Sequence, residues 1–261
     1  MSIITLTTDF GAGSPYAAAM KGVILSLNPA ATLVDITHEV PPQDVRYAAI
    51  VLEDVSDRFP GGTIHVVVVD PGVGTDRALV FARIGRQSFL APDNGVLSRL
   101  ARCTPPAKII RLTEAAYWLH PVSATFHGRD ILAPVAARLS LGLEPDHLGT
   151  PMERLVMLDW PTVHLGPRRI EGSILWIDSF GNLVTDILAE MLPGPPDNRR
   201  LQTRCRGHEA TGLCRTYGDR APGNLIALIG SSARLELAVV GGSAAALTQA
   251  HLGDPVEVCW D

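Results

Sequence analysis

The feature of this sequence that most limits its fold is the nearly unbroken run of β-branched residues at 64–69, IHVVVV. A run without polar alternation is typical of a strand that is buried on both faces, as in a sheet covered by helices on each side. The run stops at Asp70-Pro71-Gly72, which is a turn signal. We therefore expect a buried central strand with an α/β domain built around it.

The first half of the chain alternates short apolar runs with helix-like segments, as an α/β domain requires. Ser14 is a candidate N-cap, followed by Pro15 at the first helical position, and apolar residues follow at helical spacing. The pattern predicts further helices over 43–55, 96–102 and 131–139, and strands at 3–7, 32–36, 79–84, 88–91 and 108–112. We predict a central, mostly parallel sheet.

The second half has a different texture. Prolines become frequent over residues 151–169 and periodicity fades there, so we place a domain boundary between 165 and 166, giving domains 1–165 and 166–261. Short strand-like runs then alternate with Gly, Pro and Asn turns, at 170–177, 183–187, 201–205, 225–229, 234–239 and 256–260, and residues 194–198 read as a loop. This pattern predicts a smaller C-terminal β-barrel.

Composition excludes several classes of partner. The net charge of −5 gives no positive field to capture phosphate backbones, so we expect no nucleic acid partner. The N-terminus lacks the basic region of a signal peptide and no run of about 18 apolar residues occurs, so we expect no membrane insertion. The cysteines show no CxxC spacing, and we expect reduced thiols in a cytoplasmic protein: Cys103, Cys205, Cys214 and Cys259.

Familiar catalytic motifs are missing: there is no Walker A loop, GxSxG elbow, HExxH or complete GxGxxG. Polar residues instead follow the predicted strands, where open α/β sheets bind ligands. Asp9 ends the first strand and Asp70 the central one, with Arg77 seven residues later. Each is also compatible with an ordinary turn, and Arg77 with a surface position.

Further polar segments carry the same ambiguity. His127, in TFHGRD, precedes a predicted helix and could be a capped loop histidine. Asp178 and Asn182 lie in IDSFGN, which could be a polar hairpin, and the GSSARLE segment with Ser231 and Glu236 could be a plain loop.

Taken together, these segments resemble the S-adenosyl-L-methionine hydroxide adenosyltransferase family, which is related to enzymes that fluorinate or chlorinate the same substrate. The matching segments run in family order from residue 7 to about 246: TTDFG, DITHEVPPQDVRYAA, VVDPGVG with Arg77, APDNG, TFHGRD, IDSFGNLVTD, RTYGD and IGSSARLELAVVGGSAA. The resemblance implies an α/β domain, a C-terminal β-barrel and a homotrimer with sites between neighbouring subunits. It implies no cofactor and no metal.

The resemblance also implies roles for individual residues. Asp70, Arg77 and His127 stand at the positions of the family's water-activating triad. Asp9 would hold the ribose hydroxyls, Asn182 the adenine edge, and Phe126 and Phe180 the purine and ribose faces. Asp178 and Ser231 would hold the methionine amino and carboxylate groups, with Glu236 as a further candidate there.

These residue types suit hydrolysis of a sulfonium. The leaving group at ribose C5′ is already neutral on departure, so only a nucleophile is missing. Arg77 supplies positive charge but cannot act as a base. We therefore expect Asp70 to orient water and accept its proton, with His127 sharing it, and the products to be adenosine and L-methionine.

A halogenating enzyme is the nearest alternative. In the resemblance, a Tyr of the fluorinating enzymes stands where this chain has Asp70, and a halide-binding Ser where it has Gly128. A carboxylate 4 Å from an anion costs about 4 kcal/mol at an effective dielectric of 20. Hydroxide escapes that cost because it forms in place from neutral water.

Two other classes stay open from the residues alone. Asp9, Asp70, Asp93 and His127 could ligate a divalent cation in a metal-dependent hydrolase. A non-catalytic nucleoside sensor would bind the same ligand, although it has no need of a water-activating set.

Overall fold

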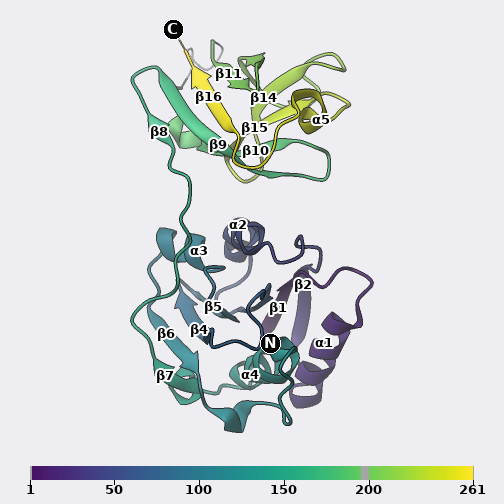
Figure 1. Ribbon diagram of the computed structural model, residues 1–261, viewed down its shortest axis with the longest axis vertical. Coiled ribbons are helices and arrows are strands. Elements are labelled where there is room, and N and C mark those ends of the chain that lie inside the picture. The colour runs from purple at the N-terminus through teal and green to yellow at the C-terminus, as the bar shows by residue number, and fades with distance from the viewer. Residues whose placement is uncertain (1, 195–199, 261) are drawn as a thin grey trace. The chain divides into compact units, whose positions relative to one another are not determined.

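The computed structural model describes residues 2–194 and 200–260, so most of the predicted loop at 194–198 lies outside the described residues. The chain forms two compact units, Met1–Leu158 and Asp159–Asp261 (Figure 1). Each unit has its own sheet and its own apolar core.

Unit 1 is built on a seven-stranded mixed sheet in the order β2-β1-β3-β5-β4-β6-β7. The pairings β2-β1, β1-β3 and β3-β5 are parallel, and β4, β6 and β7 extend the sheet by antiparallel pairing. The strands are β1 (Ile3–Thr8), β2 (Thr32–Thr37), β3 (Ile64–Val68), β4 (Leu79–Ile84), β5 (Gln87–Pro92), β6 (Lys108–Leu112) and β7 (Gly149–Pro151). The sequence predicted all of these except β7, which has only three residues.

Helices cover both faces of this sheet. The helices are α1 (Pro15–Leu27), α2 (Val45–Val55), α3 (Ser98–Cys103) and α4 (Ala133–Ser140). One core includes residues of α1 and α4, and the other includes residues of α2 and Leu97 beside α3. The central strand serves both, because Val66 and Val68 belong to the first core and Val67 and Val69 to the second. This confirms the expectation drawn from the unbroken apolar run.

Helices α2, α3 and α4 each begin two residues later than predicted, α3 at Ser98, and local reasons are visible for α2 and α4. Helix α2 begins at Val45 rather than at 43, because Gln43 adopts a positive φ of 65° and Asp44 caps the helix through the Tyr47 N–H. The predicted helix at 131–139 is α4, preceded by a π-helix over Gly128–Leu132. π-Helical turns often occur at functional sites, and this one begins directly after His127.

Unit 2 is a nearly closed, barrel-like sheet with the strand path β12-β11-β16-β9-β10-β15-β14-β13, and β8 pairs with β9. The strands are β8 (His164–Leu165), β9 (Arg169–Ile177), β10 (Leu183–Leu188), β11 (Gln202–Cys205), β12 (His208–Thr211), β13 (Leu213–Cys214), β14 (Leu225–Ile229), β15 (Arg234–Val239) and β16 (Pro255–Cys259), with a short helix α5 (Ala244–Thr248). The sequence did not predict the short strands β8, β12 and β13.

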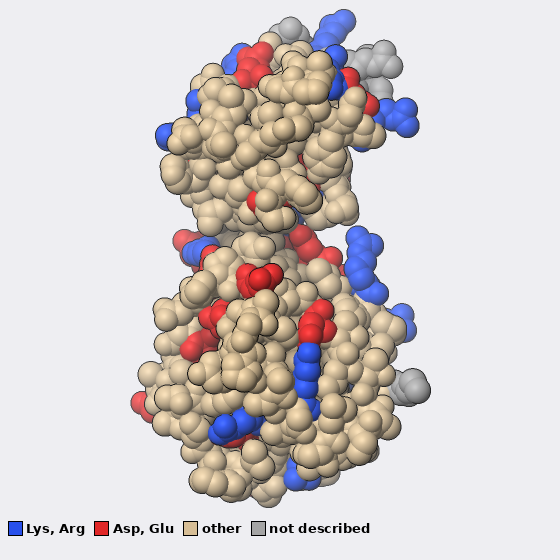
Figure 2. Space-filling model, turned by 90° about the vertical axis from the view of Figure 1, so that its right-hand side faces the viewer, with Lys and Arg blue, Asp and Glu red and all other residues tan. Residues whose placement is uncertain are grey.

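The surface fits the modest net charge. Figure 2 shows acidic and basic side chains interspersed on the face drawn, with neither sign forming a continuous field. None of the four cysteines takes part in a disulfide. Among the described residues, no helix is both long and apolar enough to cross a membrane.

One buried titratable residue sits within the unit 1 sheet. The His65 side chain is fully buried on β3, hydrogen-bonds the Thr5 hydroxyl at 2.8 Å through Nδ1, and stacks on Phe89. Its Nε2 has no hydrogen-bond partner among the described residues. Burial lowers the pKa of His65 to about 4, so the ring is neutral in the folded protein.

We predict that this histidine makes stability fall in mild acid. Its pKa is lower folded than unfolded, so its contribution is present above about pH 6.5 and is lost as pH falls toward 4. Between pH 7.5 and 5 the loss is about 2 kcal/mol. Urea unfolding of unit 1 at the two pH values measures it, with His65→Gln as the control. An equal loss in that variant would contradict the assignment.

Candidate functional site

Two predicted site carboxylates leave the unit 1 sheet at the same edge. β1 and β3 are adjacent and parallel, with Thr8 opposite Val68, so the residues after both strands emerge together. Asp9 follows β1 directly, and Asp70 lies two residues beyond β3. The topology thus places the two carboxylates beside one cavity.

Arg77 joins Asp70 to His127. Its Nε donates to both carboxylate oxygens of Asp70, at 3.0 and 2.9 Å, and one terminal nitrogen lies 2.5 Å from Oδ2. The same nitrogen lies 2.8 Å from Nδ1 of His127. The side chains of Asp70 and Arg77 are only 7% and 12% exposed, so Arg77 is not the surface residue that its motif alone would allow.

The contact with Arg77 fixes the protonation pattern of His127. A guanidinium has no acceptor atom, so Nδ1 must accept the hydrogen bond and the ring proton must lie on Nε2. Burial lowers the pKa of His127 and the positive charge of Arg77 lowers it further, while Asp70 and Asp130 act in the opposite direction. In this arrangement His127 is a neutral donor at Nε2.

These residues surround a cavity of about 230 Å³ at the edge of the sheet. It is lined by Asp9, Asp70, Phe126 and His127, together with residues that the sequence did not single out, among them Phe10 and Gln43. The rings of Phe10, Tyr16 and Phe126 meet edge to face, with centroids 5.2 to 5.7 Å apart. Four of the predicted residues therefore line one cavity. Arg77 does not line it but hydrogen-bonds two of the lining residues, Asp70 and His127.

Asp9 has a structural contact that the sequence did not indicate. Its Oδ2 accepts the Gln43 N–H at 2.8 Å, which holds Gln43 in its left-handed conformation. A non-glycine residue with positive φ at a cavity wall is a common mark of a functional site. The only sequence signal for Gln43 was its position in the PPQD segment, one of the segments that resemble the family.

Gly128 marks a tight approach beside His127. A Cβ at this position would lie 3.0 Å from both methyl carbons of Val68 and 3.3 Å from the sulfur of Met20. A serine there would need the side chains of Val68 and Met20 to shift by a few tenths of an ångström. Glycine therefore lets the π-helix pack directly on β3.

In unit 2, Asp178 organises the turn between β9 and β10. Its Oδ1 accepts the N–H groups of Phe180 and Asn182, and its Oδ2 accepts the Asn182 side-chain amide, all at 2.9 Å. This network leaves the Phe180 ring 77% exposed at the tip of the turn. Asp178, Phe180 and Asn182 are thus one structural element.

A second group of unit 2 surrounds Glu236 on β15. Tyr217 donates from its hydroxyl to Glu236 at 2.9 Å. Burial raises the pKa of Glu236, and the negative charge of Asp178 adds to the effect. Burial, with the hydrogen bond to Glu236, also raises the pKa of Tyr217 to about 12. Ser231 lies exposed in the turn between β14 and β15.

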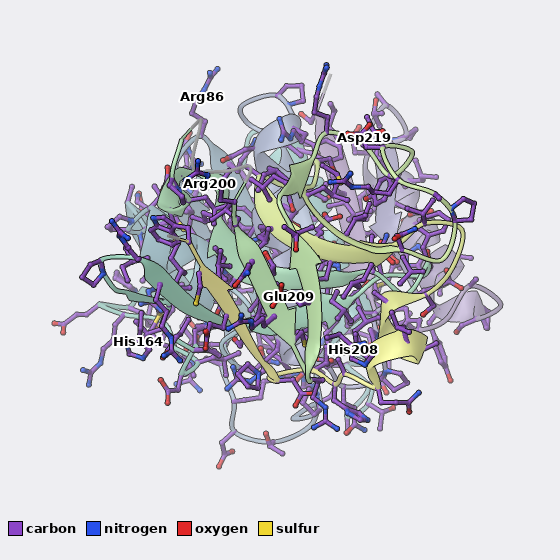
Figure 3. All side chains as sticks on the ribbon, turned by 90° about the horizontal axis from the view of Figure 1, so that it is seen from above. Arg86, His164, Arg200, His208, Glu209 and Asp219 are labelled. Carbon is purple, nitrogen blue, oxygen red and sulfur yellow. The ribbon has the colours of Figure 1, made fainter. Side chains whose placement is uncertain are left out.

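The sequence did not identify Tyr217 as a site residue, although it lies in the family-like segment RTYGD. Its loop is held by Asp219, labelled in Figure 3, which accepts from the Arg215 and Thr216 N–H groups. The motif could have indicated an ordered loop. The hydrogen bond from Tyr217 to Glu236 could be seen only in the tertiary structure.

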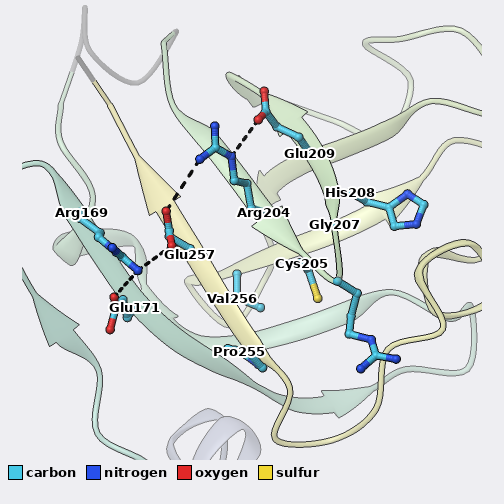
Figure 4. A pocket seen from close by; sticks show the side chains of 11 residues that line it. Arg169, Glu171, Arg204, Cys205, Gly207, His208, Glu209, Pro255, Val256 and Glu257 are labelled. Atoms are coloured by element: carbon cyan, nitrogen blue, oxygen red, sulfur yellow. Dashed lines mark hydrogen bonds and ion pairs between the residues drawn. The ribbon is translucent and has the colours of Figure 1, made fainter.

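A larger cavity of about 480 Å³ in unit 2 has different chemistry (Figure 4). Arg169 pairs with Glu171 on its own strand β9 and with Glu257 on β16, and Arg204 on β11 pairs with Glu209 on β12. These charges satisfy one another on the outside of the sheet, so we do not assign a site there.

Three of the four residues weighed as metal ligands line one cavity, but their side chains do not form a metal-binding group in the described part of the chain. Within 2–194 and 200–260, no three His, Cys, Asp or Glu side chains form a group that could hold a metal ion. Asp93 instead accepts the Val156 N–H at 2.9 Å, and burial raises its pKa. The neighbouring Asn94 donates to the Val69 carbonyl and so steadies the chain just before Asp70.

Comparisons with known proteins agree over nearly the whole chain. The family model described as the SAM hydroxide adenosyltransferase N-terminal domain matches residues 4–149, and the C-terminal domain model matches residues 172–257. A Thermus thermophilus protein named (R)-S-adenosyl-L-methionine hydrolase is 37% identical, covering 99% of this chain and 100% of its own. A solved Thermotoga maritima structure superposes with a TM-score of 0.91 at 34% identity, covering 99% of this chain and 100% of that one. A fluorinase of an Actinoplanes species is 26% identical over 71% of each chain.

Proposed function

The chain belongs to the SAM hydroxide adenosyltransferase family, and we propose that it hydrolyses S-adenosyl-L-methionine to adenosine and L-methionine. The full-length relative named (R)-S-adenosyl-L-methionine hydrolase supports this reaction and favours the (R) sulfonium as substrate. The observation that carries the proposal is Arg77 bound to both Asp70 and His127 beside the cavity.

In this mechanism a water molecule attacks C5′ of the ribose, its oxygen forms the new C–O bond, and the C5′–S bond breaks. The sulfonium takes the bonding electron pair and leaves as neutral thioether, and one proton is released. Bulk water has a pKa of about 15.7, so the site must stabilise the developing hydroxide by fixed charge. Arg77, largely removed from solvent, supplies that charge without acting as a base.

The proton goes to Asp70 in this proposal. We expected His127 to share the proton, but Nδ1 of His127 accepts a hydrogen bond from Arg77 and Nε2 already carries hydrogen. Asp70 retains lone pairs beyond those bonded to Arg77, and it lines the cavity. His127 would orient water or hydroxide through Nε2–H.

Two features of the site oppose halide as the nucleophile. The Asp70 carboxylate lines the cavity and would repel a bound anion. Position 128 is a glycine and offers no hydroxyl to a halide, and a serine there would need Val68 and Met20 to shift by a few tenths of an ångström. Water, which arrives neutral, encounters neither obstacle.

The remaining site residues keep the roles implied by the family resemblance. Asp9 would bind the ribose, Phe126 and Phe180 the ring faces, and Asn182 the adenine. Asp178, Ser231 and Glu236 would bind the methionine part. We further propose a cytoplasmic homotrimer in which each site combines the α/β unit of one subunit with the barrel unit of its neighbour.

The reaction itself can be tested with isotopic water. Protein pretreated with chelator is incubated with each sulfonium epimer in ¹⁸O water and physiological chloride, and the nucleoside is analysed by mass spectrometry. We expect adenosine with ¹⁸O at its 5′ oxygen. A chlorinated nucleoside would support the halogenating alternative, turnover only after metal is restored would support the metal hydrolase, and binding without product would support the sensor.

The division of labour between Asp70 and His127 predicts distinct pH profiles. Asp70→Asn removes the proton acceptor and should lower kcat by roughly 10²–10⁴-fold. His127→Gln keeps a side-chain donor and should lose only about tenfold, with the acid limb of the kcat profile unchanged. Loss of that limb in His127→Gln, with activity restored by added imidazole, would instead identify His127 as the base.

The shared site predicts complementation between two defective subunits. Asp70→Asn affects unit 1, and Phe180→Ala removes an exposed ring of unit 2. When both are co-expressed in equal amounts, roughly a quarter of the sites in a randomly mixed ring combine two intact units. Activity above the mean of the two separate variants is expected. Activity equal to that mean, or a monomeric mass by sedimentation, would contradict the shared site.

A further inference from the structure

We propose that a second cavity of unit 1 binds a zwitterionic amino acid with an unbranched apolar side chain. This cavity measures about 400 Å³ and shares His127 with the cavity described above. Asp70 lines the first cavity and Arg77 lines the second, so the joined side chains of Asp70, Arg77 and His127 border both spaces. The volume is within the range of about 300–1,000 Å³ typical of small-molecule sites.

The polar lining carries charges of both signs. Arg77 and Arg111 contribute guanidinium groups, and Asp76 contributes a carboxylate. In the part of the chain that the structure describes, neither Arg111 nor Asp76 has a side-chain hydrogen bond or ion pair. Arg77 uses Nε and one terminal nitrogen for Asp70 and His127, which leaves its other terminal nitrogen as a free donor among the described contacts.

The rest of the lining is apolar. Leu79 and Leu112 come from β4 and β6, and Trp118, Val122 and Ile131 come from the segment that leads into and through the π-helix. An apolar wall beside separated positive and negative groups suits a ligand with a carboxylate, an ammonium and a hydrocarbon or thioether tail.

This chemistry narrows the ligand class. A phosphorylated ligand would bring several negative charges close to Asp76, and a plain hydrocarbon would leave the arginines without a partner. An α-amino acid places its carboxylate against Arg111 and Arg77 and its ammonium against Asp76. L-Methionine fits this class, and its flexible thioether adapts to irregular apolar surfaces.

The regulatory consequence rests on the proposed function, because L-methionine is a product of that reaction. A ligand carboxylate bound to the free terminal nitrogen of Arg77 would attract the guanidinium into the second cavity. This attraction would weaken the hydrogen bonds by which Arg77 holds Asp70 and His127 in place. Binding would then slow turnover without occupying the substrate cavity. Inhibition by L-methionine should therefore include a component that is noncompetitive with the sulfonium.

The test is calorimetric titration of the whole protein with L-methionine. Arg111→Gln and Asp76→Asn alter exposed side chains and should each weaken one binding event by at least tenfold. The matched control is Arg83→Gln, an exposed arginine on the neighbouring strand β4 that does not line the cavity. In a titration with methioninamide, which lacks the carboxylate, the same binding event should be absent.

A separate control distinguishes this event from methionine bound in the substrate site. Ser231→Ala lies at the proposed methionine end of that site and should leave the event intact. The proposal is wrong if wild-type protein does not bind L-methionine at millimolar concentration, if Arg111→Gln binds it normally, or if only Ser231→Ala weakens binding. Because titration needs no turnover, a failed hydrolysis assay would overturn the proposed function while this result still decides the site.

Discussion

The rest of the site depends on the guanidinium of Arg77. It neutralises the Asp70 carboxylate and at the same time imposes acceptor character on Nδ1 of His127. Because the side chains of Arg77 and Asp70 are both largely buried, removing the arginine would leave the carboxylate uncompensated, which is far more costly than the loss of a surface ion pair. One side chain therefore sets the charge of the site, the tautomer of its histidine and the orientation of its carboxylate.

The fold brings these groups together by simple means. Parallel pairing of β1 and β3 delivers Asp9 and Asp70 to one sheet edge, and Asn94 fixes the chain just before Asp70. The π-helix after His127 packs closely onto β3 at Gly128, where a Cβ would lie 3.0 Å from the methyl carbons of Val68. The close packing also bears on the reaction, because the serine that the halogenating alternative requires would need Val68 and Met20 to shift. Backbone packing and the choice of nucleophile are thus linked at one residue.

Unit 2 contributes groups of another kind. Asp178 uses both oxygens to shape its own turn, so its first role is to present Phe180 and Asn182. Glu236 is a buried acid that accepts a hydrogen bond from the partly exposed Tyr217, and the pKa values of both groups are raised by loss of water around them. These features suit recognition of a ligand rather than bond cleavage, which fits a division in which unit 1 carries the proposed chemistry.

The sequence by itself determined the longer strands, the main helices and the candidate residues. The apolar run at 64–69 predicted a strand that is buried on both faces. The polar residues at strand ends, together with the family resemblance, identified Asp9, Asp70, Arg77 and His127. Both were predictable because strand periodicity and turn chemistry depend on residues that are neighbours in the sequence. It could not decide that Arg77 is buried against Asp70, that His127 accepts at Nδ1, that Tyr217 meets Glu236, or that Gln43 turns left-handed against Asp9. Those contacts join residues 7 to 50 positions apart, and only the packing of strands and loops sets their distances and hydrogen-bond directions.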